Sequence, residues 1–181
     1  MSVTAYEIAH ARAVEAPAIR AMQARSLREL GRGFYAAATI ESYLRAPGTL
    51  DVDLIEEGHY FVARDRAGRI LGSAGWSQRQ PAYARHGSPL ATGADRAIVR
   101  AVFVEPDCAR QGIGTALMHH VERDSLAAGI ELLTLSATLS GVPLYLRLGY
   151  RAGQPRTIVL SDGAGLDVLD MSKSRGLRRA A

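Results

Sequence analysis

The chain of 181 residues lacks several features that would place it in other classes of protein. It has a single cysteine, Cys108, which cannot form an internal disulfide, so a disulfide-stabilised extracellular module is excluded. No apolar run reaches eighteen residues, and the first residues lack the basic-then-apolar pattern of a secretory leader. We therefore expect no membrane span and a cytoplasmic location.

Motifs for metal binding are missing as well. The sequence contains no HExxH and no paired CxxC, and the adjacent His119 and His120 do not have the spacing of metal ligands. We interpret both histidines as surface residues and expect no metal.

Lysine is also scarce, with Lys173 the only one, so arginine supplies nearly all the positive charge. The net charge of +4 would suit an anionic partner. However, three arginines lie in the last seven residues, where we expect a disordered basic tail, 173–181. A nucleic-acid-binding function would rest on this tail alone, without interleaved aromatic residues, and is disfavoured.

The composition is that of a single domain. A hydrophobic fraction of 48% with 22% charged residues is ordinary for a soluble globular protein, and 181 residues suffice for one full core. No repeat, low-complexity tract or linker indicates a second domain. We assign residues 1–172 to one domain.

The most informative stretch runs from residue 98 to residue 122. Ile98–Val104 is rich in branched residues and is bounded by Pro106, which predicts a buried strand. After a polar turn come Gly112 and Gly114, and apolar residues then recur at the four-residue spacing of a helix face: Ile113, Leu117 and Val121. The first amides of such a helix have no intrahelical partner, and glycine lets an anion approach the backbone closely. The stretch predicts a phosphate-binding loop, although the glycines alone could be plain helix-start punctuation.

Two common phosphate loops do not fit. A dinucleotide fingerprint requires a third small residue where this chain has Leu117, and a nucleoside-triphosphate loop requires a lysine after Gly114, where Thr115 stands.

The rest of the chain alternates predicted strands and helices. Further strands are predicted at residues 5–9, 60–64, 70–77, 131–137, 156–160 and 166–171, and helices at 15–30, 36–45 and 142–148. The strands at 60–64 and 70–77 should form one hairpin, and those at 156–160 and 166–171 another. Residues 78–95 show no period and are interpreted as a substrate-binding loop or as surface filler. This order implies an α/β sheet with helices on both faces.

Two segments resemble a known family. The pattern V-x-P-x-x-A-R-Q-G-I-G-T-A-L, ending at Leu117, is similar to the coenzyme A pyrophosphate loop of the GCN5-related N-acetyltransferases (GNAT). The family signature, Arg/Gln-x-x-Gly-x-Gly/Ala, is met at Gly112 and Gly114 but departs at Ala109. In the second segment, Leu144-Tyr145 and Gly149-Tyr150 match a family motif, with Thr138 at a place often held by asparagine.

The resemblance implies a fold and a cofactor site. The fold would be a mixed, mostly antiparallel sheet of six or seven strands flanked by about four helices. It would splay between the strands at 98–104 and 131–137, and acetyl-coenzyme A (acetyl-CoA) would bind in the gap. The cofactor would contact Val102, Phe103, Val104, Ala109, Arg110, Gln111, Gly112, Ile113, Gly114, Thr115 and Thr138.

For the chemistry, the resemblance places the Tyr145 phenol over the sulfur, where it would protonate the leaving thiolate. The alternative for Tyr145 is a core aromatic residue with its hydroxyl at the surface. Glu105 could be the base, directly or through water, or merely a solvated residue before Pro106. Trp76 could wall the acceptor pocket or be buried in the core, and the acidic residues Asp53, Glu56 and Glu57 could line that pocket or be solvated.

The expected function is acetyl transfer from acetyl-CoA to a primary amine, on a small molecule or a peptide, directly within a ternary complex. Cys108 lacks an adjacent histidine and should face the pyrophosphate end of the cofactor, so a covalent acyl-enzyme is not expected. A homodimer is common in the family. The alternative is a coenzyme A-binding regulatory or degenerate module without turnover.

Overall fold

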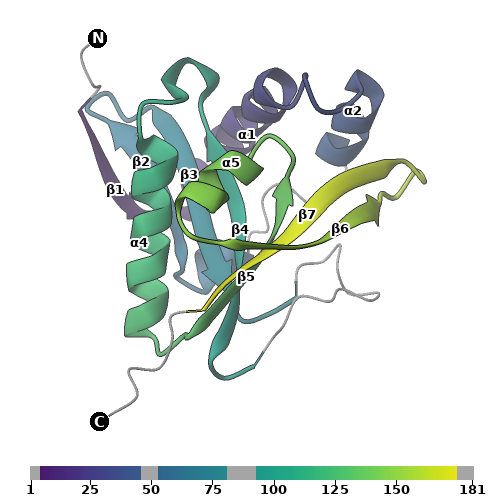
Figure 1. The fold of residues 1–181 in the computed structure, drawn as a ribbon. Helices are drawn as coiled ribbons and strands as arrows, with labels where there is room; N and C mark the ends of the chain where they lie inside the picture. The colour runs from purple at the N-terminus through teal and green to yellow at the C-terminus, as the bar shows by residue number, and fades with distance from the viewer. Residues whose placement is uncertain (1–4, 46–52, 81–92, 175–181) are drawn as a thin grey trace.

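A single mixed sheet organises the protein (Figure 1). The computed structural model describes residues 5–45, 53–80 and 93–174. Its seven strands lie in the order β1-β2-β3-β4-β5-β7-β6, and all neighbours are antiparallel except the parallel pair β4 and β5. The strands are β1 (Tyr6–His10), β2 (Tyr60–Asp65), β3 (Ile70–Ser77), β4 (Arg96–Val104), β5 (Leu132–Thr138), β6 (Arg151–Val159) and β7 (Gly165–Ser174). The expected mixed, mostly antiparallel sheet of six or seven strands is confirmed.

Five α-helices accompany this sheet in the described part of the chain. They are α1 (Ala16–Leu30), α2 (Ala37–Arg45), α3 (Asp53–Glu56), α4 (Ile113–Ala127) and α5 (Val142–Arg147). The sequence predicted four of them and missed α3, because a four-residue helix is too short to show a period. The limit set for the tail was also wrong, since Lys173 lies in β7 and its ammonium contacts both carboxylate oxygens of Glu122 at 2.8 Å.

Alternate residues of β2 show that helices cover both faces, as predicted. Phe61 and Ala63 are fully buried in one cluster with apolar residues of α4, whereas Tyr60 and Val62 pack in a second cluster with Ile19 of α1. This two-residue alternation is the pleat of a strand buried on both sides. In Figure 1, α4 accordingly lies in front of the sheet, and α1 and α2 lie behind it.

Trp76 belongs to the core under α4. It is 2% exposed, its indole N–H donates to Asp124 Oδ2 at 2.7 Å, and its ring stacks on His59 with centroids 3.9 Å apart. Of its two predicted roles, the buried core residue is therefore correct.

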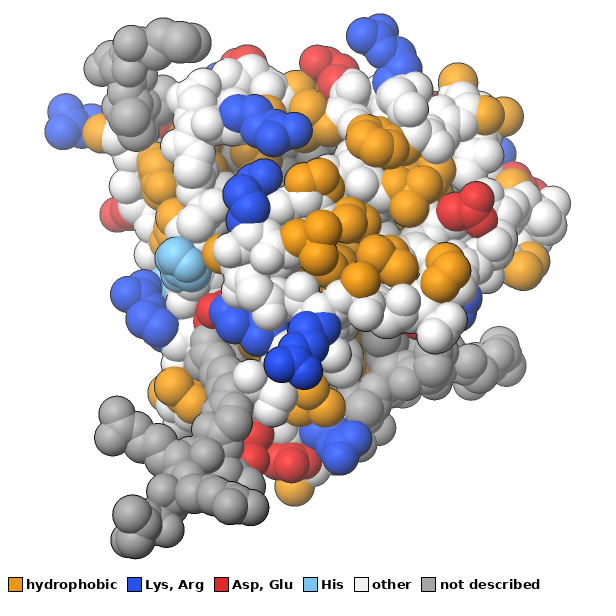
Figure 2. All heavy atoms as spheres, viewed as in Figure 1, with side chains coloured by type: hydrophobic (Ala, Val, Ile, Leu, Met, Phe, Trp, Pro, Cys, Tyr) orange, Lys and Arg blue, Asp and Glu red, His pale blue; other side chains and the backbone are white. Residues whose placement is uncertain are grey.

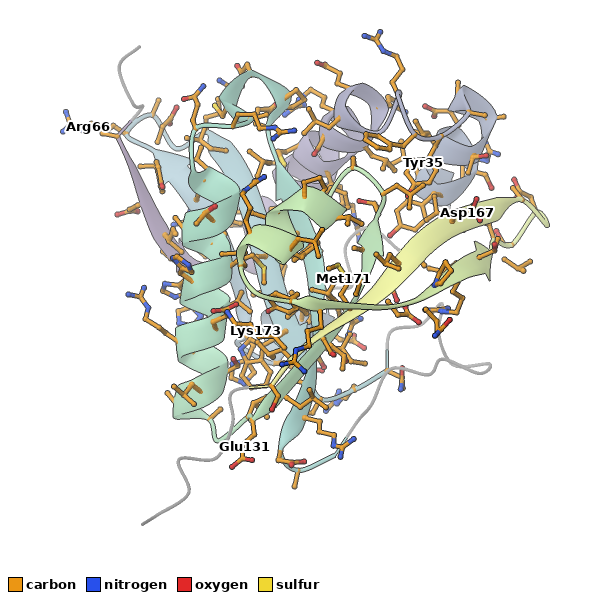
Figure 3. The ribbon with its side chains drawn as sticks, in the orientation of Figure 1. Tyr35, Arg66, Glu131, Asp167, Met171 and Lys173 are labelled. Atoms are coloured by element: carbon orange, nitrogen blue, oxygen red, sulfur yellow. The ribbon has the colours of Figure 1, made fainter. Side chains whose placement is uncertain are left out.

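A tyrosine connects the helices behind the sheet to its β7 end. The Tyr35 hydroxyl donates to the carbonyl of Asp167 at 2.7 Å and accepts the amide N–H of Leu139 at 2.7 Å (Figure 3). The segment between α1 and α2 is thereby held against β7 and against the turn that follows β5.

The surface seen in Figure 2 carries scattered arginines and a patch of apolar side chains where α5 lies in Figure 1. Leu146 of α5 is 52% exposed. None of the described helices is both long and apolar enough to span a bilayer.

Candidate active site

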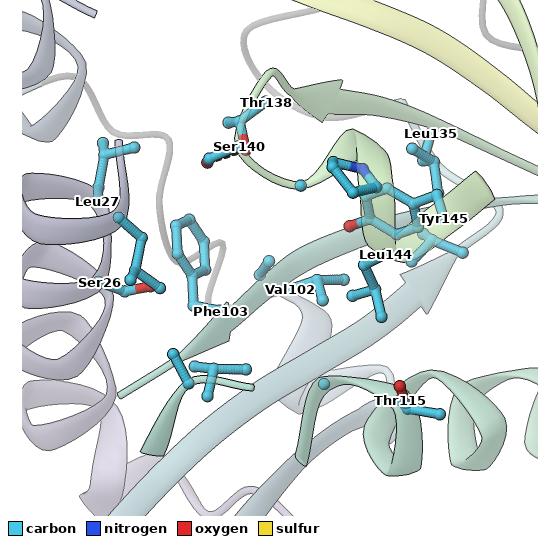
Figure 4. A pocket seen from close by; sticks show the side chains of 18 of the residues that line it. Ser26, Leu27, Val102, Phe103, Thr115, Leu135, Thr138, Ser140, Leu144 and Tyr145 are labelled. Atoms are coloured by element: carbon cyan, nitrogen blue, oxygen red, sulfur yellow. Dashed lines mark hydrogen bonds between the residues drawn. The ribbon is translucent and has the colours of Figure 1, made fainter. Parts of the chain in front are cut away.

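The sheet opens between β4 and β5. Their parallel pairing covers only residues 96–98 of β4 against residues 132–134 of β5. Beyond it the facing edges diverge, while β4 stays paired with β3 and β5 stays paired with β7. A cleft of about 610 Å³ lies there, lined by Val102, Phe103 and Val104 of β4 and by Thr138 of β5 (Figure 4). The splay expected from the resemblance is present.

A β-bulge in β4 shapes the floor of this cleft. Phe103 pairs with Ser73 but Arg100 pairs with Gly75, so β4 has one extra residue between these pairs. Ala101 takes up the extra length at φ 54°, in the left-handed region, and its carbonyl accepts the Ser73 hydroxyl at 2.9 Å. Such a bulge redirects the side chains on either side of it.

The glycine loop forms one end of the cleft. Arg110 at φ 63° and Gly112 at φ 87° turn the chain, and α4 begins at Ile113. The first backbone hydrogen bond of α4 is donated by Ala116 to Gly112, so the amides that precede Ala116 are not used by the helix. These amides, together with the positive end of the helix dipole, constitute an anion-binding site.

Close packing explains why the second glycine is small. A Cβ on Gly114 would lie 3.3 Å from Leu144 Cδ2 and 3.4 Å from Val104 Cγ2. The start of α4 therefore contacts both α5 and β4, which brings the loop, the splayed strand and Tyr145 into one cavity.

Not every residue of the predicted loop reaches this cavity with its side chain. Ala109, Arg110, Gly112, Gly114 and Thr115 line the cleft. The Gln111 amide instead folds back to donate to the carbonyl of Asp107 at 2.9 Å, and the Ile113 side chain is buried in the core. For the last two residues the structure leaves only the backbone amides as candidate contacts.

Tyr145 stands over the middle of the cleft. It is 7% exposed, lies edge-on to Tyr150 with centroids 5.7 Å apart, and lines the cavity. Figure 4 shows its hydroxyl directed into the cavity, on the same side as Val102. Of the two predicted positions for this residue, the cleft is the one observed.

The opposite end of the cleft is formed by the helices behind the sheet. Its lining is mainly apolar and aromatic: Ser26, Leu27, Leu30, Phe34, Tyr43 and Leu54. We call this set the acceptor wall. Figure 4 shows Ser26 and Leu27 of α1 facing Tyr145 across the cavity, with Phe103 between them.

The charges on the cleft have one sign. Among the described residues that line it, the charged ones are Arg100, Arg110 and Arg147, and there is no aspartate, glutamate or histidine. Desolvated arginines attract anionic groups, and an arginine beside the loop suits a pyrophosphate.

Glu105 is not placed as the predicted base. It is 3% exposed, does not line the cleft, and its carboxylate accepts Arg25 Nε at 2.9 Å and Arg25 Nη2 at 2.7 Å. Arg69 lies a further 3.8 Å away. The alternative, a solvated residue, is also wrong. A buried carboxylate held by two arginines is suited to joining α1 to the end of β4.

The other candidates from the sequence lie outside the cleft. Asp53 and Glu56 are exposed on α3, and Glu57 contacts Arg79 at 3.4 Å. His119 is exposed as expected, whereas His120 packs half-buried against Phe61, and burial lowers its pKa. No cluster of three or more potential metal ligands was found within the described ranges.

Cys108 is buried beneath the loop. Burial and a hydrogen bond to Asp107 Oδ1, at 3.2 Å, raise the pKa of its thiol to about 11. The thiolate, which is the nucleophilic form, is therefore scarce at neutral pH.

Sequence reasoning missed Arg100, Ser136 and the acceptor wall. Arg100 was detectable in principle, because it is a charged residue inside a strand otherwise composed of apolar ones. Ser136 lines the cleft while bonded to Asp170 Oδ1 at 2.7 Å, a contact that no local pattern indicates.

Comparisons with known proteins agree with this geometry. The family model of the acetyltransferase (GNAT) domain matches residues 56–152, just over half of the chain. The chain belongs to the GNAT acetyltransferase family. The match of this GNAT domain spans β2 to the start of β6, including the whole of β4, the loop and α5.

Solved structures share the GNAT fold at low sequence identity. A GCN5-related N-acetyltransferase from Rhodopseudomonas palustris superposes with a TM-score of 0.72 at 20% identity, covering 96% of this chain and 98% of that one. The PaiA N-acetyltransferase from Thermoplasma acidophilum, in complex with coenzyme A, gives 0.68 at 14% identity, covering 94% and 99%. The ribosomal-protein-S18-alanine N-acetyltransferase from Escherichia coli gives 0.60 at 20% identity, covering 94% of each chain. A search of curated protein sequences returned no match.

Proposed function

We propose that this GNAT protein transfers the acetyl group of acetyl-CoA to a primary amine, directly within a ternary complex. The observation that carries the proposal is the single cavity that joins the glycine loop, the splayed edge of β4 and the Tyr145 hydroxyl. The coenzyme A bound to the Thermoplasma acidophilum relative supports acetyl-CoA as the co-substrate.

The loop is suited to the pyrophosphate of coenzyme A. Amides from Ala109 to Thr115 and the Arg110 guanidinium lie where α4 presents its positive end. An arginine and unpaired amides together supply charge-assisted hydrogen bonds to phosphate oxygens.

The open edge of β4 is suited to the pantetheine arm. Beyond Ile98 the edge that faces β5 has no paired strand, so its backbone groups can bond the two amides of pantetheine as an added strand would. We place this contact at Val102, Phe103 and Val104, with Thr138 on the opposite side of the cleft.

The reaction is attack by the neutral amine on the thioester carbon. A C–N bond forms, and a backbone N–H near Val102, at the bulge, stabilises the oxyanion of the tetrahedral intermediate. The C–S bond then breaks, and the Tyr145 hydroxyl protonates the departing thiolate to give coenzyme A. Tyr145 regains its proton from the solvent.

The amine must lose a proton, and the lining of the cleft identifies no carboxylate or imidazole for this step within the described residues. We infer that this proton leaves to water. Because Glu105 is bound by Arg25 and lies outside the cavity, we assign it to holding α1 and β4 together rather than to proton transfer.

Two measurements test the proposal. Calorimetric titration of acetyl-CoA measures binding, and release of the coenzyme A thiol in a screen of amines measures turnover. Binding without thiol release from any amine would identify the alternative, a coenzyme A-binding module without catalysis. Absence of binding would refute both.

A further inference from the structure

The acceptor end of the cleft offers an amine two kinds of contact. The acceptor wall and Phe103 present aliphatic and aromatic surface from α1, α2, α3 and β4. Leu54 is 1% exposed and Leu27 3% exposed, whereas Phe34 remains 52% exposed at the mouth. An apolar body of moderate size would gain about 25 cal/mol per Å² of surface that this wall removes from water.

The second contact is a buried cation. Arg100 is 8% exposed and lines the cleft. It lies directly opposite Gly75 in the β3–β4 ladder, where a Cβ would point at Tyr60 of the α1-side cluster. Because opposite residues project to the same face, Arg100 projects to the α1 side, where the acceptor wall lies.

An arginine in this position favours a carboxylate. A guanidinium presents five N–H donors in a planar fork that matches the two oxygens of a carboxylate. Arg100 also makes an interaction within the protein, which uses only part of this donor set. A carboxylate in the cleft would compensate the cost of keeping the cation out of water.

Cationic acceptors lack a matching partner here. Polyamines and agmatine carry positive charges besides the reacting amine, yet the described lining residues include three arginines and no carboxylate. In the sequence outside the described residues, the only carboxylate side chain is that of Asp51. Like charges in a partly desolvated cleft repel such acceptors.

We propose that the acceptor is an α-amino acid with an apolar side chain, whose carboxylate binds Arg100 and whose side chain packs on the acceptor wall. This inference rests on the proposed acetyl transfer. The amine nitrogen forms a bond to the acetyl carbon and gives up one proton to water, and the thiolate gains one proton. The products are an N-acetylated amino acid and coenzyme A.

The test uses acceptor pairs that differ only by the carboxylate: L-phenylalanine with phenethylamine, and L-leucine with isoamylamine. Spermidine and agmatine represent cationic acceptors. For the wild type we expect kcat/KM to favour each amino acid over its decarboxylated partner by about 10–150-fold, the range of a hydrogen-bonded charge contact. Arg100→Met should remove this preference and leave turnover of phenethylamine within about threefold.

Two further variants separate binding from folding. Arg100→Lys keeps the charge but not the fork, so we expect a smaller loss for the amino acids. Asp51→Asn should leave the amino acid preference unchanged. Acetyl-CoA affinity and thermal stability are measured for each variant, so that a collapsed protein is recognised and its Arg100→Lys counterpart used instead.

Several results would overturn the inference. They are equal turnover within the acceptor pairs, equal losses for both members of a pair in Arg100→Met, or a preference for spermidine or agmatine that Asp51→Asn abolishes. Failure of the proposed function looks different, because then no amine at all, phenethylamine included, would release thiol from bound acetyl-CoA.

Discussion

Replacing Tyr145 by phenylalanine tests the chemistry with the smallest possible change. The substitution deletes one hydroxyl from a side chain that is 7% exposed and keeps the edge contact with Tyr150. The ring still fills the space beside Gly141, where a Cβ would lie 3.2 Å from Tyr145 Cε2. The cavity should therefore keep its shape.

The magnitude of the effect separates two roles for this hydroxyl. If it makes only an ordinary hydrogen bond, its loss costs about 0.5–1.5 kcal/mol, which slows the reaction by roughly tenfold at most. If it protonates the thiolate, the loss is about 10²–10⁴-fold in kcat, or about 2.7–5.4 kcal/mol. We expect the second range, with acetyl-CoA affinity nearly unchanged.

The assay is a single-turnover measurement of thiol release with the best acceptor of the screen, so that chemistry limits the rate. Tyr150→Phe is the matched control, because Tyr150 is 2% exposed, contacts Tyr145 and does not line the cleft. A Tyr145→Phe enzyme that reacts within tenfold of the wild type, or no more slowly than Tyr150→Phe, would refute the proton-donor role.

Four other predictions concern the loop, the ion pairs and the thiol. Gly112→Asp should abolish acetyl-CoA binding by calorimetry, because it adds a negative charge at the loop, whereas Gly112→Ala, equally strained at φ 87°, should still bind; binding by both would remove the phosphate-site assignment. Glu105→Gln should lower the free energy of unfolding in denaturant titrations by about 1–3 kcal/mol through loss of the charge-assisted bonds from Arg25, and should keep kcat within about tenfold; a loss of 100-fold or more with normal stability would restore Glu105 as the base. Cys108→Ala should stay active, and intact-mass measurement should find no acetyl adduct after incubation with acetyl-CoA; an adduct that forms as fast as turnover would contradict direct transfer. Burial opposes ionisation of Glu15, but hydrogen bonds from arginines outweigh it and lower its pKa to about 2 from 4.5, so its stabilising contribution is complete above about pH 4.5 and is lost as the pH falls towards 2; Glu15→Gln should thus cost stability at pH 6 but little at pH 2, and a cost independent of pH would disprove this linkage.

The cofactor half of the site was predictable because its determinants are local. Pro106 ends β4, a glycine at φ 87° starts α4, and the four-residue spacing of Ile113 and Leu117 sets the buried face of the helix. Each of these signals depends on neighbours within one or two turns of chain. The positions of the strand, the loop and the helix could therefore be predicted to within about two residues.

The acceptor half could not be predicted in this way, since its residues meet only in the folded protein. Glu105 is bound by Arg25, which lies 80 residues earlier in the chain, and no pattern around Pro106 indicates that partner. The acceptor wall likewise combines residues of three helices that precede β2. What the strand pattern did contain was the single charge at position 100, whose partner face depends on the bulge.

The bulge explains how one strand can serve both substrates. Val99 lies on the α4 side of the sheet, and Arg100 on the α1 side. After the extra residue, Val102 and Val104 return to the α4 side and Phe103 to the α1 side. In a regular strand, residues 100, 102 and 104 would share one face. The arginine would then lie on the same side as the valines next to the loop, away from the acceptor wall. Ala101 at φ 54° costs about 1–2 kcal/mol, and this strain places the cation with the acceptor while the following residues line the cofactor cleft.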